Sequence, residues 1–245
     1  MSGPPVPRLA TERLILREWR DSDRAPFAAI NADARVMEFM SRSLDRAASD
    51  AMVARIVAHW AEDGFGLWAV EVAATGAFIG FVGLSRPNFE AAFTPCVEVG
   101  WRLAADAWGY GYATEAGRAA LRFGLEVLDL AEIVSFTVPA NVRSRAVMER
   151  LGLRRDPADD FDHPNLPEGH PIRRHVLYRL SRSDWRDSHA TGSDGRCAGP
   201  LEGPLAKARA HCGCRRAYGK RACLTRSGRQ PPPRGRTTRP GPPRR

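Results

Sequence analysis

Residues 96–118 read CVEVGWRLAADAWGYGYATEAGR and predict a strand, a glycine turn and a helix, in that order. Gly109 and Gly111 allow the turn to adopt positive φ and to approach a ligand closely. The helix that begins near Ala113 has first-turn N–H groups without an intrahelical acceptor, and such groups bind phosphate. No Lys follows the turn, and Thr114 stands where a third glycine would complete a dinucleotide motif. We expect this turn to bind a pyrophosphate.

Segments with strand and helix patterns alternate on both sides of this stretch. Apolar residues at alternate positions predict strands, and apolar residues three and four apart predict helices. The predicted strands are Thr11–Trp19, Leu67–Ala73, Ala77–Leu84, Val97–Leu103, Glu132–Val138 and Ile172–Leu180, and the predicted helices are about Ala25–Asn31, Asp45–Trp60, Gly111–Leu128 and Asn141–Leu151. The two strands joined near Gly76 indicate a hairpin, and the strand, helix and strand of residues 97–138 indicate a parallel pair. We therefore expect an α/β fold.

The charge is distributed unevenly along the 245 residues. Residues up to Arg186 include 23 Lys and Arg against 25 Asp and Glu, whereas residues from Asp187 onward include 14 against 3. The second part is rich in Pro, Gly and Arg, and such a segment cannot bury enough apolar surface to offset its ordering entropy. We expect a folded domain over residues 1–186 and a disordered basic tail over residues 187–245. Nucleic acid is an expected partner only through this tail, and a passive extension is the alternative.

The sequence contains no pattern that predicts membrane insertion. Residues 1–10 lack the basic and then apolar pattern of a leader, and no apolar run of about 18 residues occurs. Cys96 stands alone in the expected domain and predicts no disulfide framework. We expect a cytoplasmic protein without membrane contacts.

Five blocks of the sequence are informative as a set: TERLILR at 11–17, FIGFVGL at 78–84, EVGW at 98–101, WGYGYATEA at 108–116 and NVRSRAVMERLGL at 141–153. In this order they resemble the GNAT superfamily of acetyl-CoA-dependent N-acetyltransferases, and most closely its branch of ribosomal-protein alanine N-acetyltransferases. The resemblance implies a mixed, mostly antiparallel central sheet with helices on both faces, splayed between the fourth and fifth predicted strands. It also implies acetyl-CoA as co-substrate, no metal, and an amine as acceptor.

The resemblance assigns the coenzyme to two neighbouring segments. The phosphate signature of the superfamily aligns its first, fourth and sixth positions with Trp108, Gly111 and Ala113. Amides of the turn are then expected to bind the pyrophosphate, while the strand end pairs its backbone with the pantetheine as an added strand would. The implied coenzyme residues are Trp101, Arg102, Leu103, Trp108, Gly109, Tyr110, Gly111, Tyr112, Ala113, Thr114 and Asn141. A tight turn that binds nothing is the alternative.

The same resemblance implies two catalytic candidates, Glu98 and Ser144. An acidic residue on this strand often faces the acceptor amine through water in the superfamily, and Ser144 is expected to form a hydrogen bond near the coenzyme sulfur. The alternatives are an exposed carboxylate or an ion pair with Arg102 for Glu98, and ordinary helix-start geometry beside a capping Asn141 for Ser144. Many members carry a tyrosine acid where this chain has Met148, which cannot donate a proton.

The expected reaction is direct attack of an amine on the thioester in a ternary complex, with a backbone N–H near Trp101 as donor to the oxyanion. A protein N-terminal amine is the expected acceptor, because an α-amine is neutral at pH 7 more often than a lysine amine; an aminoglycoside or polyamine is the alternative. His163 and His170 are expected to line the acceptor groove, and their spacing to His175 does not fit a metal site. A non-catalytic acyl-CoA-binding regulatory module is the alternative from another class.

Overall fold

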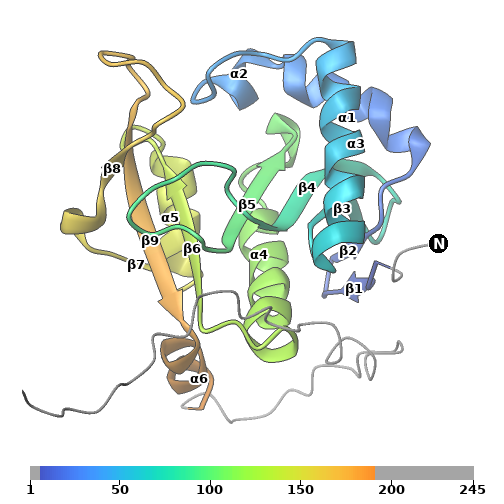
Figure 1. Cartoon of the computed structure of the whole chain (residues 1–245). Helices are drawn as coiled ribbons and strands as arrows, with labels where there is room; N and C mark the ends of the chain where they lie inside the picture. The colour runs from blue at the N-terminus through green and yellow to red at the C-terminus, as the bar shows by residue number, and fades with distance from the viewer. Residues whose placement is uncertain (1–5, 191–245) are drawn as a thin grey trace, which may run out of the picture. The chain divides into compact units, whose positions relative to one another are not determined.

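The structure is a computed structural model that describes residues 6–190 (Figure 1). Its strands are β1 (Leu9–Ala10), β2 (Leu14–Arg17), β3 (Leu67–Val72), β4 (Phe78–Ser85), β5 (Glu98–Leu103), β6 (Glu132–Thr137), β7 (Arg154–Arg155), β8 (Phe161–Asp162) and β9 (Arg174–Ser181). Its α-helices are α1 (Arg24–Ala32), α2 (Ala34–Met37), α3 (Arg46–Asp63), α4 (Tyr112–Arg122), α5 (Val142–Arg150) and α6 (Arg182–Ala190). A π-helical turn, Phe123–Val127, follows α4 directly.

The strands form one mixed sheet in the order β1-β2-β3-β4-β5-β6-β9-β7, and β8 pairs with β9. All pairings are antiparallel except the parallel contact between β5 and β6. That contact has a single residue pair, Glu98 with Val134, after which the two strands diverge (Figure 1). The mostly antiparallel sheet with a splay between β5 and β6 confirms the expected fold class.

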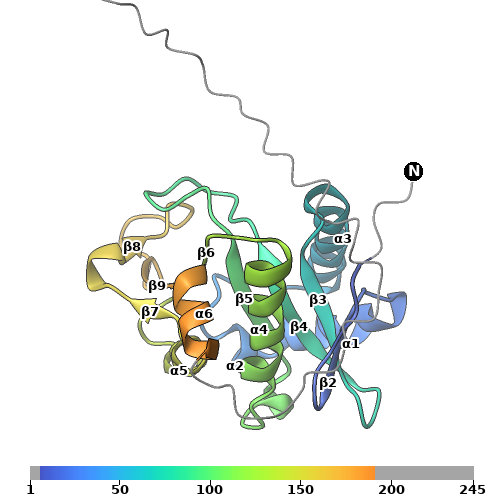
Figure 2. The same ribbon diagram turned by 90° about the horizontal axis from the view of Figure 1, so that it is seen from below.

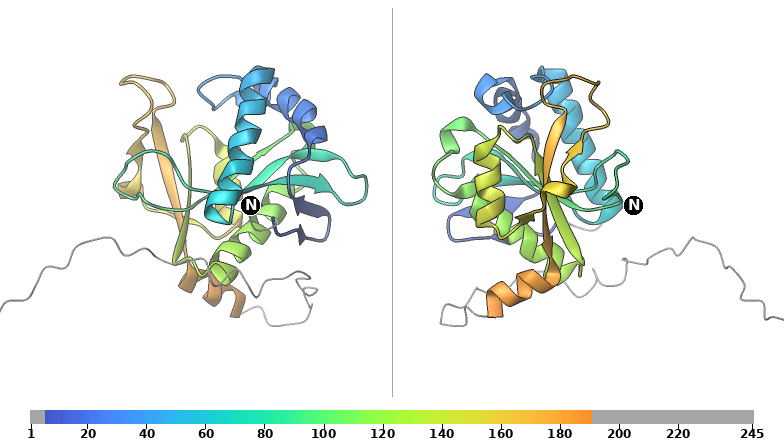
Figure 3. Two further views of the ribbon diagram at one scale, coloured as in Figure 1. Left: turned by 45° about the vertical axis from the view of Figure 1, so that its right-hand side comes forward. Right: turned by 90° about the vertical axis from the view of Figure 1, so that its left-hand side faces the viewer.

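Helices cover both faces of the sheet (Figure 3). On one face, Val82, Val99 and Leu103 pack in a cluster with Ala116 and other α4 residues. On the other face, a smaller cluster joins residues of α1, α3 and β4, namely Phe27, Val53 and Phe81. Because side chains alternate along a strand, β5 presents even-numbered residues to the α1 and α3 side and odd-numbered residues to the α4 side.

The helix ends follow from local chemistry. Asp45 caps α3 by accepting from the Ala48 N–H, and Gly64 ends that helix at φ 73°. Asn141 caps α5 by accepting from the Ser144 N–H. Capping by Asn141 was one of the two roles considered from the sequence, and the cap at Asp45 was not predicted. The short elements β1, β7, β8 and α2 were not predicted either, because two to four residues give no periodic pattern.

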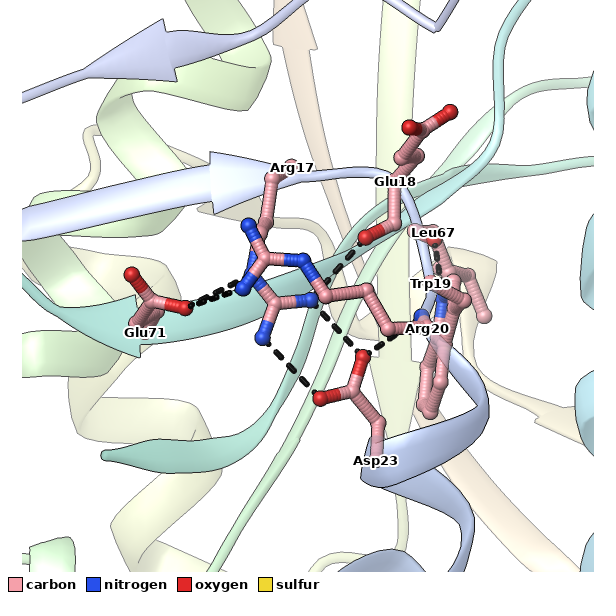
Figure 4. Close-up of polar contacts among 7 residues, drawn as sticks. All are labelled: Arg17, Glu18, Trp19, Arg20, Asp23, Leu67 and Glu71. Atoms are coloured by element: carbon pink, nitrogen blue, oxygen red, sulfur yellow. Dashed lines mark hydrogen bonds and ion pairs between the residues drawn. The ribbon is translucent and has the colours of Figure 1, made fainter. Parts of the chain in front are cut away.

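A buried ion-pair network fixes the start of α1 against β2 and β3 (Figure 4). Arg17 donates to both carboxylate oxygens of Asp23, at 2.7 and 2.9 Å, and to Glu71 at 2.8 Å. The side chains of Arg17 and Asp23 are 6% and 3% exposed. Arg20 joins from the surface, contacting Glu71 through its side chain and Asp23 through its backbone N–H. Both carboxylates are therefore compensated despite their burial.

The C-terminal end of the described chain is α6, which lies beside the turn that follows α4 (Figure 2). Trp185 of α6 is 2% exposed and donates to Glu126 at 2.8 Å. The helix continues past Arg186 to Ala190. The basic tail expected from residue 187 otherwise lies outside the described residues. Among residues 6–190, none of the helices has the length and apolarity that crossing a bilayer demands.

Candidate active site

A cavity of about 1100 Å³ lies between the start of α4, the end of β5, α2 and α5. In Figure 1, α2 lies above the end of β5 at which the strand has left β6. The cavity brings together all the expected coenzyme residues and Ser144; the residues of this set are Trp101, Arg102, Leu103, Trp108, Gly109, Tyr110, Gly111, Tyr112, Ala113, Thr114, Asn141 and Ser144. Glu98, His163 and His170 do not line it.

The glycine turn has the geometry of an anion site. Gly109 and Gly111 adopt φ values of 83° and 82°, and nothing lies within 4 Å of a Cβ placed at Gly109, so backbone conformation alone requires that glycine. In residues 6–190, the N–H groups of residues 109–114 have no protein acceptor, and the first bonded amide is that of Glu115, to Gly111. Six consecutive N–H groups at a helix start are thus free to bind an anion.

Residues just before β2 hold this turn in place. Glu115 accepts hydrogen bonds from the Thr11 hydroxyl at 2.6 Å, the Arg13 N–H at 2.8 Å and the Arg13 guanidinium at 2.7 Å. Arg13 also donates to the Tyr110 carbonyl at 2.9 Å. Burial raises the pKa of Glu115, but the bonds from Thr11 and Arg13 outweigh it and bring the net pKa below its usual value. The carboxylate is therefore ionised when it ties the turn to β2.

Arginines surround the cavity near the turn, and the sequence reading did not assign them. Arg118, Arg143 and Arg150 line it, and Arg143 stacks on the Trp108 ring at 4.6 Å while pairing with Glu38 at 2.8 Å. Arg118 and Arg150 have no ion-pair partner among the described residues. Such groups suit phosphates. These three arginines could not be singled out from the sequence, because every basic residue other than histidine in residues 1–186 is an arginine.

The splay frees one edge of β5. The carbonyl groups of Val97 and Val99 face β6, where they accept from the Val134 N–H and the Ser135 hydroxyl. By the alternation of backbone groups along a strand, the N–H and C=O of Trp101 face the same side. No β6 residue pairs with Trp101, since the register ends at Glu98. An extended ligand chain and an oxyanion therefore both have unpaired backbone groups available here.

Glu98 lies at the base of the splay, at the first position of β5. Within residues 6–190 its carboxylate has neither a hydrogen-bond donor nor a cation as partner, and burial raises its pKa to about 8. The alternative of an ion pair with Arg102 is wrong, because that guanidinium contacts Asn31 at 2.7 Å instead. A half-buried carboxyl group with a pKa near neutrality suits general base catalysis.

The residues at the start of α5 divide their tasks. Asn141 is 8% exposed, and its side chain accepts from the Ser144 N–H and donates to the Thr137 hydroxyl. Asn141 therefore caps α5, as the sequence allowed. The Ser144 hydroxyl has no hydrogen-bond partner within the described chain and borders the cavity. Met148 is buried in the core, at 1% exposure.

The two histidines expected in the acceptor groove do not line the cavity, and their role toward an acceptor stays a prediction. The His163 ring packs among Phe89, Phe161 and His175, with centroid distances of 4.5 to 6.3 Å. Burial and the neighbouring His175 lower the pKa of His163, so its ring is neutral at pH 7. His170 accepts from the Ile172 N–H in the loop before β9. Within residues 6–190 no group of three or more His, Cys, Asp or Glu is arranged to hold a metal ion.

Comparisons with known proteins agree with this geometry. The sequence pattern that defines the acetyltransferase (GNAT) domain matches residues 13–154. The FsC-acetyl coenzyme A-N(2)-transacetylase of Aspergillus fumigatus is 34% identical over 130 residues, which is 50% of this chain and about half, 52%, of that protein.

Two solved structures share the fold at lower identity. The ribosomal-protein-S5-alanine acetyltransferase of Vibrio fischeri is 17% identical with a TM-score of 0.58, covering 73% of this chain and 98% of that one. The spermidine N-acetyltransferase of Vibrio cholerae, in complex with CoA and spermine, is 18% identical with a TM-score of 0.57, covering 71% and 98%. The matched domain spans more than half of the sequence, including the turn, the splayed strand and the start of α5, and on this evidence the chain belongs to the GNAT acetyltransferase family.

Proposed function

We propose that this protein transfers the acetyl group of acetyl-CoA to the α-amine of an acceptor by direct attack within a ternary complex. The observation that carries the proposal is the row of unpaired N–H groups at residues 109–114 beside the unpaired edge of β5. The N–H groups bind a pyrophosphate, and the edge of β5 binds the extended chain that leads away from that pyrophosphate. Arg118, Arg143 and Arg150 supply positive charge for the remaining phosphate.

The residues at the splay suit acetyl transfer. The amine nitrogen attacks the thioester carbonyl carbon, and the Trp101 N–H donates to the oxygen that gains charge. The carbon–sulfur bond then breaks, and the thiolate accepts a proton from the Ser144 hydroxyl, which regains one from solvent water. The proton lost by the amine passes through water to Glu98. Since the pKa of Glu98 is about 8, this group is mostly neutral at pH 7 and gains capacity as a base above it.

An α-amine fits this arrangement better than a lysine side chain. About a tenth of α-amines are neutral at pH 7, against fewer than about one lysine amine in a thousand. A polypeptide N-terminus, expected from the sequence, presents such an amine, whereas the alternative acceptors, an aminoglycoside or a polyamine, do not. The similar structures include a ribosomal-protein acetyltransferase and a spermidine acetyltransferase at nearly equal similarity, so fold likeness does not separate the two sources.

The proposal is tested by incubating the purified full-length protein and acetyl-CoA with a panel of amines and peptides, and by following CoA release and an acetyl mass gain of about 42 Da. The Glu98→Gln, Ser144→Ala double variant is the matched control: we expect it to bind CoA normally by calorimetry and to lose transfer. Binding of CoA by the unaltered protein without transfer to any amine would instead identify a non-catalytic acyl-CoA-binding module. Absence of CoA binding would overturn both readings.

A further inference from the structure

Arg102 is a cation without a counter-ion at the edge of the cavity. Its Nη1 contacts Asn31 Oδ1 at 2.7 Å and Met52 Sδ at 3.6 Å, and its Nη2 contacts Met40 Sδ at 3.6 Å. The buried Nε has no partner, and no Asp or Glu of the described chain pairs with the guanidinium. A guanidinium offers five N–H donors in a fork that matches a carboxylate; here one donor contacts an oxygen and two contact sulfur, which accepts only weakly.

The position of Arg102 is fixed by a buried polar chain. Asn31 of α1 and Ser49 of α3 are both fully buried, and Asn31 Nδ2 donates to Ser49 Oγ at 2.9 Å. Asn31 Oδ1 then accepts from Arg102, whose guanidinium also lies 5.6 Å from the centroid of the Phe81 ring. Burial lowers the pKa of Arg102 to about 10, which still leaves it charged at pH 7. An apolar side chain would fill this place at lower cost, so the charge has a use other than folding.

This charge lies on the side of the sheet opposite α4. Arg102 pairs with Phe81 of β4, which packs against α1 and α3, whereas the odd-numbered β5 residues pack against α4. The free N–H groups of the turn and the three arginines assigned to phosphates belong to α4, α5 and the loop before α4. The pyrophosphate can therefore be bound without Arg102, and the positive charge of Arg102 is available to bind the acceptor.

Glu98 shares this face of β5, four residues before Arg102 and roughly 13 Å away between Cα atoms. Between them stands Gly100, and the sole atom near a Cβ placed there is Glu98 Oε1 at 3.8 Å. The carboxylate thus leans over Gly100 toward Arg102, and the space above the glycine is open. A carboxyl group with no partner among the described residues and a guanidinium with no counter-ion among them flank one open position on the sheet, at the point where the strand leaves β6.

From this juxtaposition we propose that the acceptor is a small amino acid or amino-acid derivative with a free carboxylate, which Arg102 binds while the amine faces Glu98. This inference rests on the proposed acetyl transfer and narrows its acceptor. A polyamine presents only positive charge to Arg102, and a polypeptide N-terminus places a neutral peptide carbonyl where a carboxylate would bind. A cation at one end of the site and a proton-accepting carboxyl group at the other favour a molecule that carries both a carboxylate and an amine.

The test compares matched acceptors with the full-length protein. CoA release from acetyl-CoA is measured with the twenty L-amino acids, their carboxamides, spermidine and an alanine-initiated tetrapeptide. We expect at least one amino acid to be acetylated with a kcat/KM about tenfold or more above that of its carboxamide, the tetrapeptide and spermidine. A ratio below about threefold for every amino acid, with transfer to any other amine, overturns the inference and leaves the proposed function intact. Transfer to no amine overturns both.

Two variants then assign the preference to Arg102. Arg102→Gln is expected to reduce kcat/KM for the amino acid about tenfold more than for its carboxamide, and Arg102→Lys, which keeps the charge, to retain part of the preference. Arg118→Gln is the control, a cavity-lining cation on α4 expected to raise the KM for acetyl-CoA without altering the ratio. If Arg102→Gln raises only the KM for acetyl-CoA, the guanidinium serves the coenzyme and the inference fails. Thermal unfolding of each variant shows whether it is folded.

Discussion

Arg13 and Glu115 lie 102 residues apart in the chain and meet at 2.6 Å, joining the start of β2 to the first turn of α4. The same guanidinium donates to the Tyr110 carbonyl and covers the Tyr112 ring at 5.0 Å. One side chain therefore contacts three positions of the glycine turn. The TER block at 11–13 is explained by this contact, since Thr11 and Arg13 together provide three hydrogen bonds to Glu115.

We expect Glu115→Gln to weaken CoA binding about tenfold, because the turn loses its charge-assisted link to β2 and its N–H groups lose their alignment. Arg13→Met should have a similar effect, and the double variant should be little worse than either alone, since both remove one interaction. Calorimetric titration of CoA measures the three values. Additive losses in the double variant would show that the two side chains act separately.

Gly109→Ala tests the backbone of the turn. A Cβ at Gly109 meets no atom within 4 Å, so the substitution acts only through the cost of φ 83° for a non-glycine residue. Gly152→Ala is the matched control, with φ 87° and equally open surroundings after α5. We expect both variants to lose on the order of 1 kcal/mol of unfolding free energy, and only Gly109→Ala to lose CoA affinity, by tenfold or more. Equal CoA affinities in calorimetry would contradict the role of the turn.

The sequence was sufficient to predict those parts of the site that depend on neighbouring residues. The positive φ of Gly109 and Gly111 and the cap at Asn141 follow from local chemistry, and the structure contains all three. The contact of Asn31 with Arg102 has no such signature, because it joins α1 to β5 across 71 residues.

The expectation that His163 and His170 line the acceptor groove was based only on their position in the loop before the last predicted strand. The structure packs His163 into an aromatic cluster with Phe89 and Phe136, and neither histidine lines the cavity. The sequence of a loop rich in His and Pro does not predict which of its side chains point into the protein, because the path of the loop depends on the strands at both ends.

The pH dependence of the reaction should reveal Glu98. Below the pKa of both Glu98, about 8, and the acceptor amine, two groups must lose a proton, so log kcat/KM should rise with a slope near two there and flatten only above the higher of the two pKa values. Glu98→Gln should reduce kcat about a hundredfold or more and lower the slope to one, with the KM for acetyl-CoA nearly unchanged. Glu62→Gln, at an exposed position of α3, is the control. An unchanged slope in the Glu98 variant would remove this residue from the proton transfer.

The same carboxylate should reduce stability at alkaline pH. Its pKa is about 8 in the folded protein against an ordinary 4.5, so the folded state binds more protons between these values and the free energy of unfolding falls as pH rises through that window. Glu98→Gln removes the fall. We expect equal melting temperatures near pH 4.5 and a higher one for the variant at pH 8.5, by on the order of 5 °C. Calorimetry measures Tm against pH for both proteins. Parallel curves for the unaltered protein and Glu98→Gln would show that folding does not raise the pKa of Glu98.

Asp23→Asn tests the buried network beneath α1. Asp23 accepts two bonds from Arg17 and one from the Arg20 N–H, and its side chain is 3% exposed, so loss of its charge leaves Arg17 with Glu71 alone. We expect the free energy of unfolding to fall by about 3 to 5 kcal/mol, as for other broken buried ion pairs. Asp21→Asn, two residues away, is the matched control. Its side chain is 98% exposed and pairs only with Arg24, so the expected change is within about 0.5 kcal/mol. Urea unfolding measures both, and equal effects of the two substitutions would mean that the buried pair contributes no more than a surface pair.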